Sequence, residues 1–373
     1  MKSGQFVVLG LYEVHMASAM VMVDGEVIAA THEERFSRLK NDAGFPYQAA
    51  RFCLEQAGIA PHEVDAVTFI NESFPPAGVA NILFKRPALF GPKEWLEENE
   101  RYWKPRLLER RDPGPYFRIM GGWDRVPDGH YYDLKRLDMD AEPGTVSETF
   151  NALRRDAVER LLGVPGERVH FMPHYMCHHY HAYYSGRLRG KDVVVIHAEG
   201  EGGRYNSAVS RPTSEGLTVI AGTDECDLGR LYQWTTLLLG MKPYHHEYKL
   251  MGLAPHASAH EVRRSLEVFA PIFKLDEEQM VIRYNERPPD LYFFFRDRLQ
   301  GHRFDGIAGA LQQMLEERLM EWVSLVVRRT NASRVCYGGG VAMNVKANMR
   351  LFQLEDVKEL FVPLSPGDES NVF

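Results

Sequence analysis

The order of apolar and polar residues predicts a three-stranded meander at the start of the chain. Residues 5–11, 18–23 and 26–31 are three runs rich in β-forming apolar residues. The dipeptide Asp24-Gly25, between the second and third runs, is typical of a two-residue hairpin turn. We therefore expect three consecutive antiparallel strands before residue 32.

A helix and a fourth strand are predicted after this meander. Pro46 suits the first turn of a helix, Gly58 suits its C-terminal stop, and apolar residues recur on one side between them. A short apolar run over residues 66–70 then reads as a strand.

The second half of the chain repeats this order of elements. Strands are predicted over residues 192–196, 205–210 and 217–221, and a long helix with one apolar stripe over 307–330. A strand at 334–337, a glycine turn and another helix follow. Two βββαβα halves are the pattern of actin-like ATPases, which hold a nucleotide in the cleft between the halves. The sequence thus predicts an α/β fold of duplicated actin-like halves.

This pattern also gives domain boundaries. We expect residues 1–70 with 150–185 to form the first half and residues 186–373 to form the second. Residues 71–150 between them are rich in Pro, Trp, Tyr and Arg and lack the same regularity, so they are interpreted as a mostly helical insertion. This insertion is either a helical elaboration with a solvated charged face or a lid that recognises an acceptor.

Composition narrows the classes of function. A chain of 373 residues with 45% apolar content can bury two cores. The net charge of -7 argues against nucleic acid or anionic membranes as general partners. No stretch approaches the ~20 apolar residues of a membrane span, and the start does not resemble a signal peptide, so we expect a cytoplasmic protein. Four scattered cysteines indicate neither a disulfide framework nor a thiolate zinc site.

A cluster of histidines is the strongest candidate for chemistry. His174 and His178 stand four residues apart, which places both imidazoles on one face of a helix. Such pairs also occur by chance on wet helical surfaces. His197 and Glu199 follow a predicted strand and add further ligands, so a site for Fe(II), Zn or Mn is predicted.

Two segments of the first half could bind a substrate. His15 lies in the turn between the first two strands, which faces the cleft in actin-like folds, and it is either a general base or a surface residue. Arg38 and Lys40 follow the third strand and could clamp a phosphate or carbonyl oxygen, or could lie in a solvated loop.

The second half offers a glycine turn and an acidic turn. Gly338, Gly339 and Gly340 separate a strand from a helix, which allows backbone N–H groups to approach a phosphate or ribose. Asp368 is the one evident metal or nucleotide ligand of the later turn Pro363-Leu364-Ser365-Pro366-Gly367-Asp368.

Five ordered motifs carry a resemblance to a known family. They are VVLGLYEVHMASAMVMVDGEVIAATHEERFSRLKNDAGFP, PHYMCHHYHAYYSG, HHEYKLMGLAP, YGGGVAMN and FVPLSPGDES. In this order they closely resemble the O-carbamoyltransferases of antibiotic and nodulation-factor biosynthesis, of the cephamycin and tobramycin type. The resemblance runs from residue 6 to 370.

The resemblance implies an actin-like domain, related to enzymes that put threonylcarbamoyl on tRNA, that transfers a carbamoyl group from carbamoyl-adenylate to an acceptor. It places the family's iron-binding histidines on His174 and His178, its GD-turn aspartate on Asp368 and its cleft histidine on His15. In the implied mechanism, the metal polarises the carbamoyl oxygen and His15 takes the proton of the acceptor hydroxyl or amine.

The same resemblance implies the nucleotide contacts. The family's glycine turn falls on Gly339, Gly340 and Asn344, and Glu247 and Lys249 fall on a motif that lines the same cleft.

Two positions depart from the family pattern. His197 stands where an aspartate ligand is usual, so either His197 or Glu199 would be the third protein ligand. Losing that carboxylate would weaken the neutralisation of a divalent ion. Met16 replaces an aspartate that would orient His15.

Length is a further departure. Family members continue into a second domain that makes carbamoyl-adenylate from carbamoyl phosphate and ATP, so we expect that domain elsewhere, in a longer chain or another subunit. The expected acceptor is a small natural product, as in antibiotic biosynthesis, and a homodimer stays open. The alternatives are an actin-like ATPase or kinase and a catalytically altered partner subunit.

Overall fold

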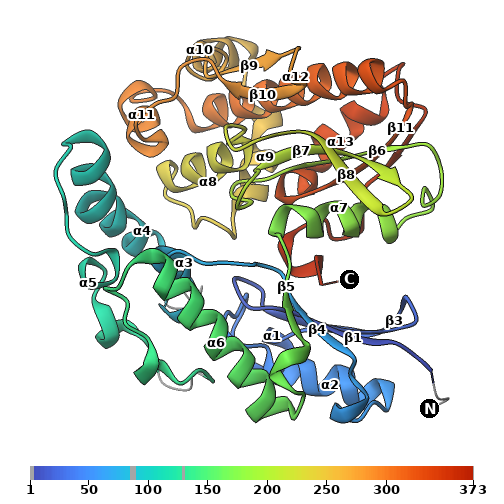
Figure 1. The fold of residues 1–373 in the computed structure, drawn as a ribbon. Helices are drawn as coiled ribbons and strands as arrows, with labels where there is room; N and C mark the ends of the chain where they lie inside the picture. The colour runs from blue at the N-terminus through green and yellow to red at the C-terminus, as the bar shows by residue number, and fades with distance from the viewer. Residues whose placement is uncertain (1–3, 85–89, 128–130, 373) are drawn as a thin grey trace. The chain divides into compact units, whose positions relative to one another are not determined.

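The computed structural model describes residues 4–84, 90–127 and 131–372, and divides the chain into two compact units. The first unit consists of Met1–His174 with Glu369–Phe373, and the second of Tyr175–Asp368. Each unit contains one five-stranded mixed sheet with helices packed against it (Figure 1).

The sheet of the first unit has the order β3-β2-β1-β4-β5. Its strands are β1 (Val7–Tyr12), β2 (Ser18–Val23), β3 (Glu26–His32), β4 (Ala66–Phe69) and β5 (Val169–Phe171). The first three are antiparallel, and β4 and β5 run parallel to β1. Asp24 and Gly25 have φ values of 51° and 84°, as a tight hairpin requires, so the predicted meander is confirmed.

The helices of the first unit include α2, which packs against β2 and β3 and ends at Gly58 with φ 64°. The α-helices are α1 (Glu34–Ser37), α2 (Tyr47–Ala57), α3 (Pro76–Phe84), α4 (Pro92–Glu98), α5 (Tyr116–Ile119) and α6 (Pro143–Leu162). A π-helical segment, Asn99–Leu108, continues α4. Short 3-10 turns are Pro61–Glu63, Gly122–Arg125, Leu134–Arg136 and Gly166–Arg168.

The sheet of the second unit repeats this topology. Its strands are β6 (Val194–Ala198), β7 (Ser207–Thr213), β8 (Gly216–Thr223), β11 (Arg334–Gly338) and β12 (Glu359–Phe361), in the order β12-β11-β6-β7-β8. The first three strands in the sequence are again antiparallel, and the last two again run parallel to the first. The duplication predicted from the sequence is therefore confirmed.

Seven α-helices of the second unit's described residues surround this sheet and a two-stranded ribbon. They are α7 (His174–Tyr184, whose first residue is assigned to the first unit), α8 (Leu228–Leu238), α9 (Glu247–Leu253), α10 (Ala259–Phe269), α11 (Leu291–Arg298), α12 (Phe304–Thr330) and α13 (Val345–Phe352). The ribbon pairs β9 (Phe273–Asp276) with β10 (Val281–Tyr284), and 3-10 turns are Ala254–His256, Gly340–Met343 and Asp368–Ser370.

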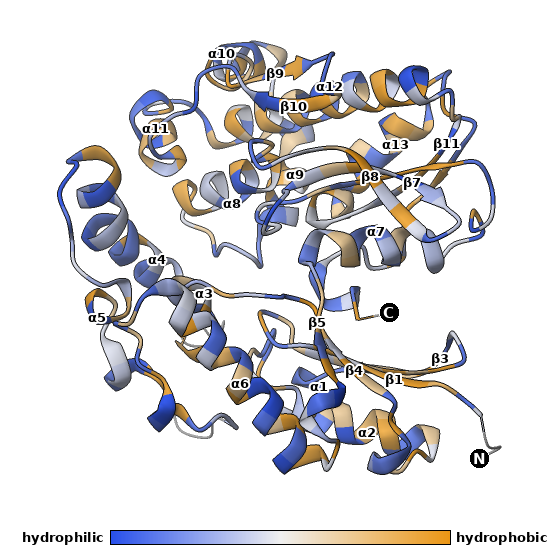
Figure 2. Ribbon diagram, viewed as in Figure 1, coloured by the Kyte–Doolittle hydropathy of each residue, from blue (hydrophilic) through white to orange (hydrophobic). Residues whose placement is uncertain are grey.

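Strand β6 is the centre of the second unit, because all its residues are buried. Its side chains alternate between the two faces of the sheet. Val194 and Ile196 belong to the large core that contains α12 and its fully buried Trp322, whereas Val195 packs with Ala182 and Tyr183 of α7. In Figure 2, helix α12 carries apolar residues, in orange, among polar ones, in blue. The alternation places His197 and Glu199 on the face that α7 covers.

In the described part of the chain, no helix is long and apolar enough to cross a lipid bilayer.

Candidate metal centre

Helix α7 presents the two histidines of the predicted pair on one face. His174 is its first residue and His178 lies one turn later, with 7% and 1% of their surfaces exposed. Because the two residues are four apart on α7, a single helical turn holds both side chains. Gly338 allows α7 to lie close to β11, since a Cβ there would be 2.9 Å from the His178 carbonyl oxygen.

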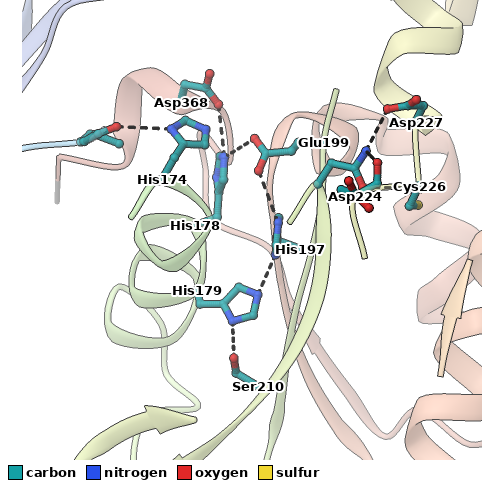
Figure 3. A network of polar contacts seen from close by, with 12 residues as sticks. His174, His178, His179, His197, Glu199, Ser210, Asp224, Cys226, Asp227 and Asp368 are labelled. Atoms are coloured by element: carbon teal, nitrogen blue, oxygen red, sulfur yellow. Dashed lines mark hydrogen bonds and ion pairs between the residues drawn. The ribbon is translucent and has the colours of Figure 1, made fainter. Parts of the chain in front are cut away.

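Four side chains bring potential ligand atoms within 4.8 Å of one another: His174, His178, Glu199 and Asp368. His178 Nε2 lies 2.9 Å from Glu199 Oε2 and 3.2 Å from Asp368 Oδ1 (Figure 3). Two imidazoles and two carboxylates are a donor set that suits Fe(II), Zn or Mn. Glu199 is almost completely buried, and its carboxylate lies between the imidazoles of His178 and His197.

Backbone hydrogen bonds fix the loop segments that carry Glu199 and Asp368. The Glu199 N–H donates to the Asn206 carbonyl at 2.9 Å, which extends the pairing of β6 with β7. Asp368 follows a turn whose Pro366 carbonyl accepts from Gly339 N–H at 3.1 Å. The glycine turn after β11 and the acidic turn are thereby tied together.

His197 lies outside this group of four. Its Nε2 is 3.3 Å from Glu199 Oε1, and its Nδ1 is 2.7 Å from His179 Nε2. Of the two candidates for a third ligand, Glu199 is the one that lies with His174, His178 and Asp368. His197 contacts Glu199 but does not belong to the group. Burial lowers the pKa of His197 and takes that of His179 well below its usual range.

Sequence reasoning assigned no role to His179 and Ser210. His179 Nδ1 lies 2.5 Å from Ser210 Oγ, and both side chains are fully buried. His179 stood within the histidine cluster, but a consecutive position on a helix is about 100° away from His178, so spacing did not connect it to the site. Ser210 lies on β7, and only strand register brings it near.

The glycine turn leads from β11 into a 3-10 turn and α13. Gly339 has φ 92° and ψ 162°, and a Cβ there would lie 2.5 Å from the Ala198 carbonyl oxygen. At Gly340 the same substitution would meet nothing within 4 Å, so the backbone is approachable there. Gly338 pairs with His197, which puts this turn beside the end of β6.

Asn344 has a structural function in this turn. Its side-chain oxygen accepts from Ala347 N–H at 3.0 Å and so caps α13. Its amide nitrogen donates to Gln312 Oε1 at 2.9 Å and to the Tyr232 hydroxyl at 3.2 Å. Its predicted contact with a nucleotide stays a prediction.

Glu247 and Lys249 belong to α9 and are not among the four clustered ligands. Glu247 is the first residue of α9, its Oε1 accepts from Tyr244 N–H at 2.7 Å, and burial raises its pKa to about 7. Lys249 is exposed, and its Nζ lies 5.9 Å from the centre of the Tyr248 ring.

The remaining predicted residues lie in the first unit. His15 is half-buried in the turn between β1 and β2, edge-on to Tyr12 with 6.2 Å between ring centroids. Arg38 and Lys40 are exposed after α1, and Lys40 Nζ forms an ion pair of 2.9 Å with Glu34.

Sequence comparisons identify a family for this chain. The family model described as carbamoyltransferase N-terminus matches residues 7–75 and 157–372. The chain is 26% identical to the uncharacterized protein sll1178 of Synechocystis, covering 95% of this chain and 53% of that protein. It is 25% identical to the nodulation protein NolNO of Sinorhizobium fredii, covering 95% and 44%. The chain therefore spans about half the length of these relatives.

The fold is similar to that of a solved structure. The crystal structure of full-length HypF in the phosphate- and nucleotide-bound form matches with a TM-score of 0.52 and 10% identity, over 98% of this chain and 54% of HypF. At this identity the similarity concerns the fold alone, and it agrees with the duplicated sheets described above.

Proposed function

Because the chain belongs to the carbamoyltransferase N-terminus family, we propose that it carries out the transfer step of a carbamoyltransferase. In this proposal a hydroxyl or amine of a small natural product attacks the carbamoyl carbon of carbamoyl-adenylate, the bond from that carbon to the phosphate oxygen breaks, and AMP leaves. Carbamoyl phosphate and ATP are the proposed co-substrates, and a further domain or subunit would make the adenylate from them.

The observation that carries the proposal is the convergence of His174, His178, Glu199 and Asp368. These residues would hold a divalent ion, with Fe(II) expected and Zn or Mn as alternatives. The ion would supply Lewis-acid polarisation of the carbamoyl oxygen. The accessible backbone at Gly340, in the turn beside β6, supports a role of the glycine turn in holding the adenylate.

His15 is assigned the role of general base. A half-buried imidazole in the turn between two strands can take the proton of an acceptor hydroxyl as it attacks, since a neutral imidazole has a ring nitrogen that accepts a proton. Arg38, Lys40, Glu247, Lys249, Gly339 and Asn344 complete the proposed adenylate contacts. The acceptor would be selected by the insertion of residues 71–150.

The decisive experiment supplies chemically prepared carbamoyl-adenylate to the purified chain with a panel of small alcohols and amines. Mass spectrometry should detect acceptors that have gained one carbamoyl group. The His178→Ala variant should lose this product, and His15→Ala should lose it while still binding the nucleotide in a direct binding assay.

Two results would overturn the proposal. ATP hydrolysis or phosphoryl transfer without carbamoylation would favour an actin-like ATPase or kinase. A chain that neither binds a divalent metal nor transfers the carbamoyl group would favour a partner subunit without catalysis.

A further inference from the structure

Behind the four clustered ligands, a line of buried polar contacts runs through the second unit (Figure 3). Ser210 Oγ lies 2.5 Å from His179 Nδ1, and His179 Nε2 lies 2.7 Å from His197 Nδ1. His197 Nε2 then lies 3.3 Å from Glu199 Oε1. The serine and both imidazoles are fully buried, and Glu199 is 3% exposed.

The protons of this line can be ordered from chemistry. An ionised carboxylate only accepts, so His197 must present Nε2–H to Glu199 Oε1. A neutral imidazole has one donor and one acceptor, so His197 Nδ1 accepts from His179 Nε2–H. His179 Nδ1 is then the acceptor for the Ser210 hydroxyl. This proton order is compatible with all three contacts in one direction, from Ser210 to Glu199, and the contact of His197 with Glu199 is an ion-pair approach without hydrogen-bond geometry.

The opposite order is unfavourable. The Ala208 backbone also lies beside His179, and if its carbonyl accepted a hydrogen bond from His179 Nδ1–H, both tautomers would be reversed. Unprotonated His197 Nε2 would then face the unprotonated Glu199 Oε1 at 3.3 Å. Two buried acceptors without a proton between them are costly.

We propose that His197, His179 and Ser210 are positioning residues that hold Glu199 as a metal ligand through one of its two oxygens. Of the two carboxylate oxygens, Oε1 is the one at ion-pair distance from His197, whereas Oε2 lies 2.9 Å from His178 Nε2 and faces the ligand cluster. This inference rests on the metal centre of the proposed function and adds three residues that would not touch the ion.

The line of contacts from Ser210 through His179 to His197, called the relay below, gives His197 a role other than direct metal binding. A histidine ligand there would leave Asp368 as the one carboxylate beside the ion, if Glu199 did not bind. With His197 turned to Glu199, the cluster keeps two carboxylates, and a neutral relay brings no positive charge near the cation.

The fold supplies this arrangement through simple geometry. Residues two apart on a strand share a face, so His197 and Glu199 both face α7. Consecutive residues of α7 diverge, so His178 faces Glu199 while His179 faces His197 and Ser210 of β7.

The test measures Co²⁺ binding to the metal-free chain by titration and by visible absorption. The variant His197→Ala should bind Co²⁺ about 10- to 100-fold more weakly, the range seen when outer partners of metal ligands are removed. His197→Gln should recover most of this loss, because the Gln amide can donate to Glu199 and accept from His179. Ser210→Ala should weaken binding less than His197→Ala does.

A matched control is available in the same unit. Ser265 Oγ lies 2.9 Å from His302 Nδ1, and Ser265 is fully buried, so Ser265→Ala removes a similar contact away from the ligands. It should leave Co²⁺ affinity unchanged. If His197→Ala fails to fold, the Co²⁺ affinity of Ser210→Ala is compared with that of Ser265→Ala instead, and equal affinities would overturn the proposal.

Tautomers give a second readout that needs no metal. In the metal-free chain, ¹⁵N chemical shifts of the imidazoles should show both His179 and His197 protonated at Nε2. Protonation at Nδ1 of either ring would overturn the relay.

The outcomes separate the two proposals. Unchanged Co²⁺ affinity in His197→Ala, with strong binding by the wild type, overturns the relay and leaves the metal centre standing. An absorption spectrum that loses one imidazole ligand in both His197→Ala and His197→Gln makes His197 a direct ligand, which also overturns the relay. Absence of Co²⁺ binding by the wild type overturns the metal centre and the relay together.

Discussion

Glu13 and Arg154 form an almost fully buried ion pair in the first unit. Arg154 Nε lies 2.7 Å from Glu13 Oε1, the Tyr132 hydroxyl donates to Glu13, and the guanidinium lies 4.3 Å and 4.4 Å from the ring centroids of Phe69 and Phe171. A buried pair of this kind adds little net stability over an apolar replacement, but losing one member leaves an uncompensated charge.

Replacing Arg154 by Met should therefore lower the free energy of unfolding of the first unit by about 3–5 kcal/mol. The double variant Glu13→Gln with Arg154→Met should be less destabilised than Arg154→Met alone. Urea denaturation followed by circular dichroism measures both. Arg155→Met is the control, since this neighbour is half-buried and stacks on Phe171 from outside. A larger loss in the double variant would contradict the charge argument.

Glu247 makes the stability of the second unit depend on pH. Its pKa is raised from 4.5 to about 7 by burial, so the folded chain holds the proton more tightly than the unfolded chain. The resulting stabilisation is complete below pH 4.5 and is lost as pH rises to about 7.

In Glu247→Gln this dependence should disappear. The stability of the wild type relative to the variant should fall by at most about 3 kcal/mol between pH 4.5 and 7, and then stay constant. Thermal unfolding at a series of pH values measures it, with Glu277→Gln, an exposed carboxylate of the same unit, as the control. If the stability of the wild type relative to Glu247→Gln rose with pH instead, the sign would contradict the raised pKa of Glu247.

At this scale the sequence predicted some side chains of the cluster and could not choose among others. The spacing of four residues was sufficient for His174 and His178, because a helix alone sets their relation. His197 and Glu199 share one face of β6. Which of the two reaches the cluster therefore depends on side-chain geometry and on the contact of His197 with His179, and no spacing in the sequence encodes these.

Among the elements, the turn from β11 to α13 has the most demanding backbone. Gly339 has φ 92° and ψ 162°, a conformation open essentially to glycine alone, and it contacts the end of β6. Gly340 has room for a Cβ and needs no such conformation.

The variants Gly339→Ala and Gly340→Ala thus form a matched pair. Gly339→Ala should cost about 3 kcal/mol or more, since backbone strain adds to the clash with the Ala198 carbonyl. Gly340→Ala should change stability by less than about 1 kcal/mol. Chemical denaturation compares them, and equal losses would show that the turn has rearranged.

Elements differed in how well the sequence predicted them. The meander of the first unit followed from the Asp24-Gly25 turn, and the predicted helix over 307–330 extends back to Phe304 as α12. The π-helical segment Asn99–Leu108 was not foreseen. It contains Pro105, which lacks an N–H and interrupts regular α-helical bonding, so its conformation depends on packing of residues such as Tyr102 and Tyr116.

At the scale of the whole molecule, repetition was visible in the sequence because each sheet begins with three strands that are adjacent in the chain. The parallel strands β4, β5, β11 and β12 were harder to place, since long segments separate them from their partners. The candidate metal centre belongs to this scale too. Asp368 is far from His178 in the sequence, and only the family's motif order connected the two.

Because the clustered side chains come from distant parts of the sequence, we expect metal binding to stabilise the folded chain. A ligand that binds the native state alone adds RT ln(1 + [L]/Kd), or about 2.7 kcal/mol at a hundredfold excess over Kd. Adding Co²⁺, Zn²⁺ or Mn²⁺ to the metal-free chain should raise its unfolding temperature, and a chelator should reverse the rise.

The same measurement on variants decides whether the four ligands are responsible. His178→Ala and Asp368→Asn should abolish the rise, because each removes a donor from a cluster that unfolding disperses. His260→Ala removes an exposed histidine of the same unit and should keep it. A rise that persists in His178→Ala would mean that the metal binds elsewhere in the native chain, since the remaining histidines are numerous enough to offer a second site.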